Sequence, residues 1–326
     1  MKNFFDRSSE QEYTWKSKHI NYFLKLKDIG PSTVEKIIAI NPDIELWEKE
    51  YVASQLPNYE KFMTLLPEEI PTVEDFDDET VVNFKEDHFP EQLKKMKKDK
   101  PLVLWYKGNL DIKNGLGIVG SRNIIPETKD FVKNFVESLK GYNLNIVSGL
   151  ANGVDEASHI AALENNLKTT AVLPSSLDNI LPYSNKNLAY EIVENGGVVL
   201  TEYEPGSPRK PENSNYIARN RIQAALSEVI VVGQSSIPGG TMATAKFTLE
   251  YQKKLAVYSS RNNLDIEEYK GNKYLLSSID SDFDFSKLKF TKKQIEMLKT
   301  KKSLADFSVS ENLEEIQSVL SIYLNE

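Results

Sequence analysis

The 326-residue sequence contains no cysteine, which excludes disulfide bonds and thiolate metal sites. Its three histidines, His19, His88 and His159, lie far apart and lack the spacing of metal ligands, so we expect neither a metal nor another cofactor. The sequence has no run of about 18 apolar residues, and its first residues lead into charged ones rather than into a signal-peptide core. These absences predict a cytoplasmic protein that is not bound to a membrane.

The sequence also lacks an excess of positive charge, since its net charge is −8. Residues 1–100 contain 15 basic and 21 acidic side chains, and residues 101–260 contain 15 of each. This balance argues against a protein that coats duplex DNA with a uniformly basic surface. An anion site in the central segment must therefore depend on a few arginines and on backbone amides.

Residues 1–66 are predicted to form a small helical domain. Apolar residues recur at helical spacing on both sides of Asp28-Ile29-Gly30-Pro31, which predicts a helix, a tight turn and a second helix. The pattern fits a helix-hairpin-helix, in which the glycine turn offers amides to a nucleic-acid phosphate, and it fits equally well a helical hairpin that only packs. Residues 67–86, which are acidic at first and carry prolines, are predicted to be a linker.

Residues 87–262 are predicted to form a Rossmann-like α/β domain. The apolar runs are GLGIVGS, NIVSGL, TTAVLP, VVLTEY, EVIVVGQ and KLAVYS, and the predicted helices between them span residues 126–140, 153–165, 185–195, 217–227 and 240–252. Short strands that alternate with helices predict right-handed crossovers and a mostly parallel sheet with helices on both faces. Residues 263–326 are predicted to be a short helical appendage, with amphipathic stretches at 292–299 and 311–324.

Small residues follow the predicted strands at the positions where an open parallel sheet binds its ligands. These residues let the backbone approach an anion, and the next helix directs its free amides toward it. The sequence has neither the full GxGxxG spacing of dinucleotide enzymes nor a GxxxxGK[ST] loop for a nucleoside triphosphate. The candidate phosphate-binding residues in these loops are Gly120, Ser121, Arg122, Ser148, Gly149, Gly239, Gly240 and Thr241.

Arg219, Asn220 and Arg221 complete the candidate site. Two guanidinium groups at a helix start can form paired hydrogen bonds with phosphates, while the asparagine caps a helix or contacts a base edge. The alternative is a helix with a solvated arginine pair. We expect Arg219 and Arg221 to contribute more to the affinity for a phosphate ligand than any other pair of residues, and a carboxylate such as Glu202 or Glu204 is the candidate to hold Arg219 in a structural ion pair.

The order of these motifs resembles the DprA/Smf family of DNA-processing proteins. The resemblance covers residues 90–260 and rests on IVGSR, SGLANGVDEASHIAAL, AVLPSSLDNILPYSNKNL, TEYEPGSP, ARNRIQAALSEVIVVGQ and PGGTMATAKFTLEYQKKLAVYS. It implies a cytoplasmic homodimer without catalytic activity that binds single-stranded DNA and recruits a RecA-type recombinase in natural transformation and DNA recombination. The candidate residues named above are those that match the family's anion pocket. Asp155 and His159 match another family element, for which we expect a structural role.

Three motifs depart from the family pattern. Ser175 and Ser176 replace the usual glycines, Pro238-Gly239-Gly240-Thr241-Met242 replaces an SGS-containing run, and Ser259-Ser260 replaces the usual Pro-Gly. These departures indicate a divergent member. Such a member could act in repair, in phage defence or with a partner protein encoded in the same operon.

Two other functions stay open from the sequence. The first is a nucleotide-binding regulatory or antitoxin-like module of the same fold. The second is a nucleotide phosphoribohydrolase, because Pro238-Gly239-Gly240-Thr241 resembles the PGGxGTxxE loop of those enzymes. That reaction needs a carboxylate near the ribosyl centre, and the loop has Ala243, Thr244, Ala245 and Lys246 where the acid would be.

Overall fold

The computed structural model describes residues 14–71, 80–207, 210–259, 265–310 and 312–324. The chain divides into two compact units. Unit 1 consists of Met1–Phe89 and Lys94–Leu104, and unit 2 consists of Pro90–Leu93 and Trp105–Glu326. None of the helices in the described part of the chain is long and apolar enough to cross a membrane.

Unit 1 is mainly helical, and the two helices predicted around Gly30 are confirmed. Its elements are α1 (Ser17–Lys25), α2 (Pro31–Ile40), η1 (Ile44–Leu46), α3 (Lys49–Ser54), α4 (Tyr59–Leu65) and the short strand β1 (Val81–Asn83). Pro31 is the first residue of α2, and its ring fixes φ at a value that suits a helix. Trp15 and Phe23 are buried, and their ring centroids lie 5.2 Å apart. The helix-hairpin-helix interpretation stays a prediction. Part of the predicted linker, residues 72–79, lies outside the described residues.

The sheet of unit 2 has the strand order β2-β6-β5-β4-β3-β7-β8-β9. Its strands are β2 (Val103–Gly108), β3 (Gly115–Val119), β4 (Asn145–Ser148), β5 (Lys168–Val172), β6 (Val198–Thr201), β7 (Val229–Val232), β8 (Lys254–Tyr258) and β9 (Phe307–Val309). The pairs from β6 to β9 are parallel, and only β2 with β6 is antiparallel among the described pairs within this sheet. Gly117 is in register with Val147 on one side and with Ile230 on the other.

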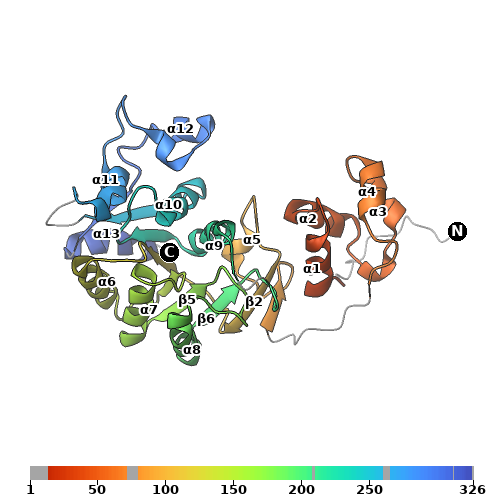
Figure 1. Ribbon diagram of the computed structural model, residues 1–326, viewed down its shortest axis with the longest axis horizontal. Helices are drawn as coiled ribbons and strands as arrows, with labels where there is room; N and C mark the ends of the chain where they lie inside the picture. Colours follow the sequence, from red (N-terminus) through yellow and green to blue (C-terminus); the bar gives the residue numbers. More distant parts are fainter. Residues whose placement is uncertain (1–13, 72–79, 208–209, 260–264, 311, 325–326) are drawn as a thin grey trace. The chain divides into compact units, whose positions relative to one another are not determined.

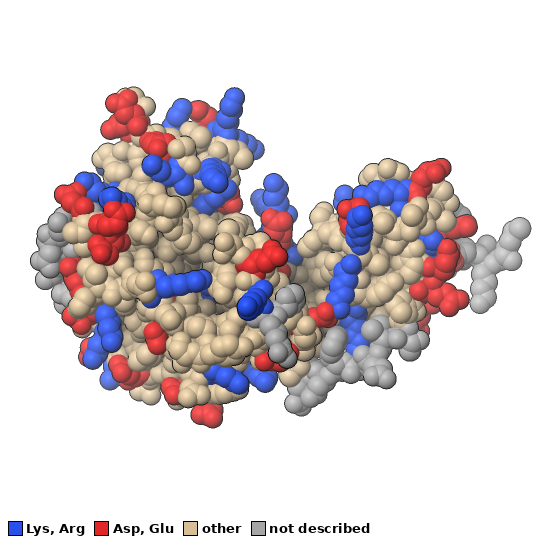
Figure 2. Space-filling model, viewed as in Figure 1, with Lys and Arg blue, Asp and Glu red and all other residues tan. Residues whose placement is uncertain are grey.

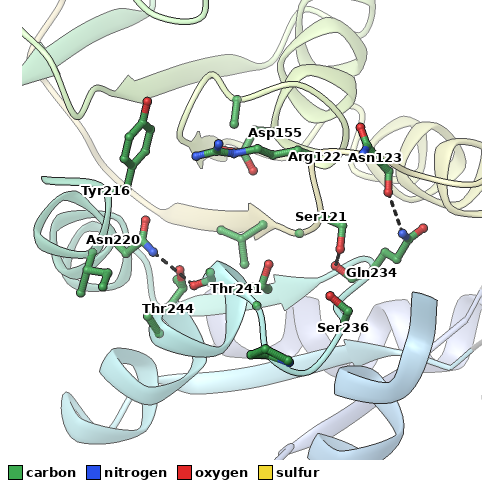
Figure 3. A pocket seen from close by; sticks show the side chains of 18 of the residues that line it. Ser121, Arg122, Asn123, Asp155, Tyr216, Asn220, Gln234, Ser236, Thr241 and Thr244 are labelled. Atoms are coloured by element: carbon green, nitrogen blue, oxygen red, sulfur yellow. Dashed lines mark hydrogen bonds between the residues drawn. The ribbon is translucent and has the colours of Figure 1, made fainter. Parts of the chain in front are cut away.

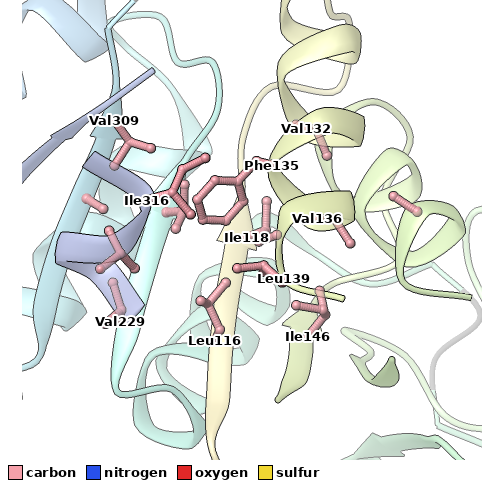
Figure 4. Packing of buried hydrophobic residues seen from close by; sticks show 14 of the residues in the cluster. Leu116, Ile118, Val132, Phe135, Val136, Leu139, Ile146, Val229, Val309 and Ile316 are labelled. Atoms are coloured by element: carbon pink, nitrogen blue, oxygen red, sulfur yellow. The ribbon is translucent and has the colours of Figure 1, made fainter. Parts of the chain in front are cut away.

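Helices cover both faces of this sheet, which confirms the predicted fold class (Figure 1). They are α5 (Glu91–Lys94), α6 (Pro126–Ser138), α7 (Val154–Glu164), α8 (Lys186–Glu194), α9 (Asn213–Leu226), α10 (Gly240–Glu250), α11 (Lys270–Leu276), α12 (Lys292–Leu298) and α13 (Leu313–Leu324), with the short turns η3 (Tyr183–Asn185), η4 (Glu267–Tyr269) and η5 (Phe285–Leu288). The five helices predicted between residues 126 and 252 are therefore confirmed, but α9 begins at Asn213, so Arg219 and Arg221 lie in its middle and not at its start as predicted. On one face, Phe135 of α6 packs with Ile118 of β3 and Ile316 of α13 (Figure 4). On the other face, Met242 of α10 packs with Ile230 of β7.

The C-terminal residues belong to unit 2 and complete its sheet. The predicted stretches at 292–299 and 311–324 form α12 and α13, whereas β9 is a strand that the sequence analysis did not predict. Tyr258 of β8 pairs with Val309 of β9, and Ile316 and Leu320 of α13 are buried in the core. The Tyr323 hydroxyl donates a hydrogen bond to the Gly115 carbonyl of β3 at 2.8 Å.

Candidate functional site

The candidate site lies at the point in the sheet where the strand order reverses, because the strands that follow β3 and β7 along the chain are added on opposite sides. Strand β3 leads through α6 to β4 on one side, and its neighbour β7 leads through α10 to β8 on the other. The loops after β3 and β7 therefore diverge, which leaves a crevice at the carboxyl ends of the strands. A cavity of about 750 Å³ occupies this position (Figure 3).

Most of the residues predicted from the sequence line this cavity. Gly120, Ser121, Arg122, Arg219, Asn220, Gly239, Gly240 and Thr241 are part of its wall. Gly149 lines a second cavity of about 300 Å³, whose wall also includes Arg122 and Arg219. Of the predicted residues, all of which are described, Ser148 and Arg221 belong to neither wall.

Arg122 is the exposed cation of the site. Its guanidinium lies over the ring of Tyr216, 4.7 Å from the centroid, and extends from the loop after β3 toward α9 (Figure 3). In the part of the chain that the structure describes, no carboxylate lies within ion-pair distance of Arg122. Because it contributes to both cavities, this guanidinium can reach an anion in either of them.

Arg219 lies beneath the cavity and is 5% exposed. Its Nη1 donates a hydrogen bond to the Val172 carbonyl at 2.8 Å, and Asp155, also 5% exposed, is its electrostatic partner. Burial lowers the pKa of Arg219 and raises the pKa of Asp155, and in each case the opposite charge of the partner counteracts the shift. Arg219 is therefore held in the floor of the site and does not present a free charge to solvent.

The glycine at position 149 makes room for this arrangement. An ideal Cβ at Gly149 would lie 1.5 Å from Nη1 of Arg219, so only glycine allows the guanidinium to take its place. The Ser148 hydroxyl donates to the Ile118 carbonyl at 2.6 Å, and backbone hydrogen bonds from Ala151 and Gly149 favour the ionised form of Asp155. Ser148 and Gly149 therefore hold the loop after β4 in place beside Arg219 and Asp155.

Arg221 is held by a carboxylate. Its Nη1 and Nη2 donate to the two carboxylate oxygens of Glu202, each at 2.5 Å, and Nη1 also donates to the Ala218 carbonyl at 2.7 Å. Glu202 therefore pairs with Arg221, and the expectation that Glu202 or Glu204 would hold Arg219 is wrong. Side chains two positions apart on a helix point in different directions. Arg219 of α9 therefore lies under the loop after β4, whereas Arg221 points toward the residues after β6.

Gln234 braces the loop after β3. Its Nε2 donates to the Asn123 carbonyl at 2.9 Å, and its Oε1 accepts from the Ile125 amide at 3.1 Å and from the Thr128 hydroxyl at 2.8 Å. The Ser121 amide and hydroxyl both donate to the Gln234 carbonyl, at 2.8 and 3.2 Å (Figure 3). Ser121 thus fixes the loop that carries Arg122.

The amino terminus of α10 forms the opposite wall. Gly239 is its N-cap and Gly240 its first residue, and a Cβ at Gly240 would meet no atom within 4 Å. Asn220 Nδ2 donates to the Gly240 carbonyl at 3.4 Å, which ties α9 to α10. The first amides of α10 and the positive end of its dipole are therefore next to open space, as an anion requires.

Several residues of the wall were not predicted from the sequence. They are Asn123, Tyr216, Gln223, Gln234, Ser236, Thr244, Glu267 and Glu268. Gln234 follows a buried strand just as Gly120 does, which is a signal that could have identified it. Tyr216 lies one helical turn before Asn220, but nothing in the local sequence indicates that its ring supports Arg122.

The histidine and aspartate that match the family element are both buried in α7. His159 is fully buried, and its Nδ1 shares a hydrogen bond with the Thr169 hydroxyl at 2.7 Å. Burial, together with the charge of Arg219, lowers the pKa of His159 to about 3, so the ring is neutral at physiological pH. This geometry supports the structural role expected for Asp155 and His159.

Two curated proteins and a family model match the central part of the chain. The family model described as DNA recombination-mediator protein A matches residues 80–281. Protein Smf of Synechocystis sp. is 37% identical over 177 residues, which are 52% of this chain and 43% of that protein. DNA processing protein DprA of Streptococcus pneumoniae is 38% identical over 154 residues, which are 47% of this chain and 53% of that protein. The chain spans about half the length of these curated relatives.

Two solved structures share the fold. The X-ray structure of DprA from Streptococcus pneumoniae has a TM-score of 0.65 at 26% identity and covers 80% of this chain and 92% of its own. A DprA structure from Helicobacter pylori, described as revealing a single-stranded DNA binding mode, has a TM-score of 0.55 at 26% identity, with 75% and 96% covered. These matches confirm the resemblance inferred from the motifs. The chain belongs to the DNA recombination-mediator protein A family, to which its Smf and DprA relatives connect it.

Proposed function

We propose that unit 2 binds single-stranded DNA in the cavity at the carboxyl ends of β3 and β7, with Arg122 as the principal phosphate contact. The observation that carries this proposal is the exposed Arg122 guanidinium, held over Tyr216 in the same cavity as the amino terminus of α10. A guanidinium offers a planar fork of donors to a phosphate, and helix amides add further donors. The Tyr216 ring gives an unpaired base a surface for stacking.

The charge distribution favours a single strand over a duplex. Basic and acidic side chains of unit 2 are interspersed on the face shown in Figure 2. Binding of a duplex from outside requires many phosphate contacts, whereas a strand that enters a cavity needs only a few focused ones. Unpaired bases can also reach polar side chains of the wall, such as Asn123 and Gln223.

The other predicted residues take two different roles in this proposal. Gly120, Gly239, Gly240 and Thr241 form the surface that a phosphate approaches, and Ser121 holds that surface in shape. Ser148, Gly149, Arg219, Asn220 and Arg221 position the surrounding loops and helices through the bonds described above. Arg122, rather than the pair on α9, then supplies the accessible charge.

We propose that this binding of single-stranded DNA serves DNA recombination in the cell. The protein would hold single-stranded DNA as a cytoplasmic homodimer and present it to a RecA-type recombinase, in natural transformation, in repair or in defence. The family description as a recombination mediator and the single-stranded DNA binding of the Helicobacter pylori protein support this placement. Co-sedimentation with a RecA-type protein, with and without single-stranded DNA, tests the recombinase partner.

The binding proposal is tested by fluorescence anisotropy with labelled single-stranded and duplex DNA over a salt series. Loss of one charge-assisted hydrogen-bonding group costs about 1.5–3 kcal/mol, so Arg122→Ala should weaken binding about ten- to a hundredfold. The salt slope should correspond to about two to four phosphates. Lys140→Ala is the matched control, because Lys140 is exposed just after α6, at the opposite edge of the sheet. Equal affinities of the two variants would overturn the assignment of Arg122.

A nucleotide ligand or a hydrolase activity is a second possibility with one observation in its favour. Glu267 and Glu268 of η4 line the same cavity, so carboxylates reach it from a segment outside the glycine loop. Glu267 is paired with Lys270, which leaves it less available to a ribosyl centre. We expect no release of free base from AMP. Base release that Glu268→Gln abolishes would show that the cavity is an active site.

A further inference from the structure

A lysine-rich loop of unit 1 is a charged feature that the cavity does not explain. Residues 94–100 have the sequence KKMKKDK, so five of the 15 basic residues in the first hundred lie within seven positions. The remaining residues of that segment are acidic on balance, with 10 basic and 20 acidic side chains. Positive charge is therefore concentrated on one loop of an otherwise acidic unit.

Contacts of Met96 and of Lys100, on either side of Lys97 and Lys98, hold this loop in place. Met96 is buried, and Lys100 pairs with Glu35 at 2.5 Å while its ammonium lies 4.8 Å from the centroid of the Phe84 ring. Asp99 has a positive φ of 53°, which turns the chain between the tip and Lys100. The loop is thus built into unit 1 rather than extending from it as a solvated tail.

Three lysines of the loop are exposed. Lys95, Lys97 and Lys98 reach solvent, and among the described residues no carboxylate lies within ion-pair distance of them. The only apolar side chain between them, Met96, points inward. The loop therefore presents positive charge without any apolar surface.

We infer that Lys95, Lys97 and Lys98 form a second contact surface for the phosphate backbone of single-stranded DNA, separate from the cavity. This inference rests on the proposed function. An exposed lysine is a flexible point charge that suits a phosphate of any sequence. Protein interfaces are instead depleted in lysine and depend on buried aromatic or apolar groups, which this loop lacks. A backbone contact of this kind adds affinity and a steeper salt dependence without sequence preference.

The test compares the full chain with a triple variant, Lys95→Ala/Lys97→Ala/Lys98→Ala. The matched control, Lys133→Ala/Lys140→Ala/Lys168→Ala, removes the same charge from exposed positions of unit 2 outside both cavities. Each phosphate contact with a single strand contributes about 0.7 to the salt slope, so the loop variant should lower the slope by about 2. Its affinity relative to the unmodified chain should then change about 20-fold between about 50 and about 200 mM salt.

The probes are thymidine oligonucleotides of about 5 and about 30 nucleotides, since the shorter strand has only about four phosphates, fewer than the contacts expected at the two surfaces together. The expected result is a large effect of the loop variant on the longer strand and a small effect on the shorter one. Equal salt slopes for the loop variant and the control would overturn the inference.

Arg122→Ala separates this inference from the proposed function. If Arg122→Ala binds like the unmodified chain while the loop variant loses affinity, the loop contact stands and the cavity assignment falls. The reverse pattern overturns the loop contact alone. Absence of any binding to single-stranded DNA overturns both.

Discussion

Replacing Gly149 with alanine places a methyl group where the Arg219 guanidinium lies. An ideal Cβ would be 1.5 Å from Nη1 and 2.3 Å from Cζ, so the guanidinium must move. Movement breaks the 2.8 Å hydrogen bond to the Val172 carbonyl and separates Arg219 from Asp155. The substitution therefore acts through the buried guanidinium of Arg219 rather than through the backbone conformation of the glycine.

The expected decrease in the free energy of unfolding follows from the interactions that Arg219 loses. The charged hydrogen bond to the Val172 carbonyl contributes about 1.5–3 kcal/mol. We expect Gly149→Ala to lower the free energy of unfolding by about 1.5–3 kcal/mol.

A double-mutant cycle with Arg219→Met tests the reasoning by urea unfolding followed by circular dichroism. Methionine is flexible and has no hydrogen bond to lose, so Gly149→Ala should cost less than about 1 kcal/mol in that background. Gly240→Ala is the control, because its methyl group would enter open space. If Gly149→Ala costs the same with arginine and with methionine at position 219, the contact with the guanidinium is not the cause.

Three further predictions concern pH, an ion pair and the helix amides. The folded state keeps His159 neutral down to about pH 3, while the unfolded chain takes up a proton below about pH 6.5, so stability falls as the pH drops below 6.5. The loss between pH 7.5 and 5.5 should be about 1.4 kcal/mol, and a His159→Gln variant followed by urea unfolding should lack it. Arg221→Met and Glu202→Gln should each lower the free energy of unfolding by about 2 kcal/mol, with the double variant losing less than the sum, while affinity for single-stranded DNA stays unchanged in anisotropy titrations. Gly240→Ala should leave the free energy of unfolding within about 0.5 kcal/mol but weaken DNA binding, because its methyl group would occupy open space at the start of α10 where the proposed phosphate lies; unchanged affinity would exclude this end of α10 from the site.

The parallel core could be predicted because its strands are buried on both faces. All four residues of β7, Val229–Val232, are buried, so the strand is a continuous apolar run that stands out between helices. Strand β9 has three residues, of which only Val309 is buried, and so short a segment carries no such pattern. The antiparallel direction of β2 also leaves no local signal, because it depends on which neighbour the strand meets.

The position of the site was predictable, but the roles of its arginines were not. Glycines and serines after successive strands indicate an anion site wherever the sheet is parallel, and most of them do line one cavity. Arg122, Arg219 and Arg221 look equivalent as residue types in the sequence. Their separation into one exposed and two held side chains depends on Tyr216, on Asp155 and on Glu202, which come from different elements.

The contact between Tyr323 and the Gly115 carbonyl has a consequence for synthesis of the chain on the ribosome. These residues are 208 positions apart, and β9 and α13 cover apolar side chains of the face that also carries α6. A nascent chain that has emerged only as far as α10 therefore exposes part of that face, and unit 2 reaches its final packing only after α13 has left the exit tunnel. Because contacts so distant in sequence form slowly, this late closure leaves an interval in which a chaperone can bind the uncovered core.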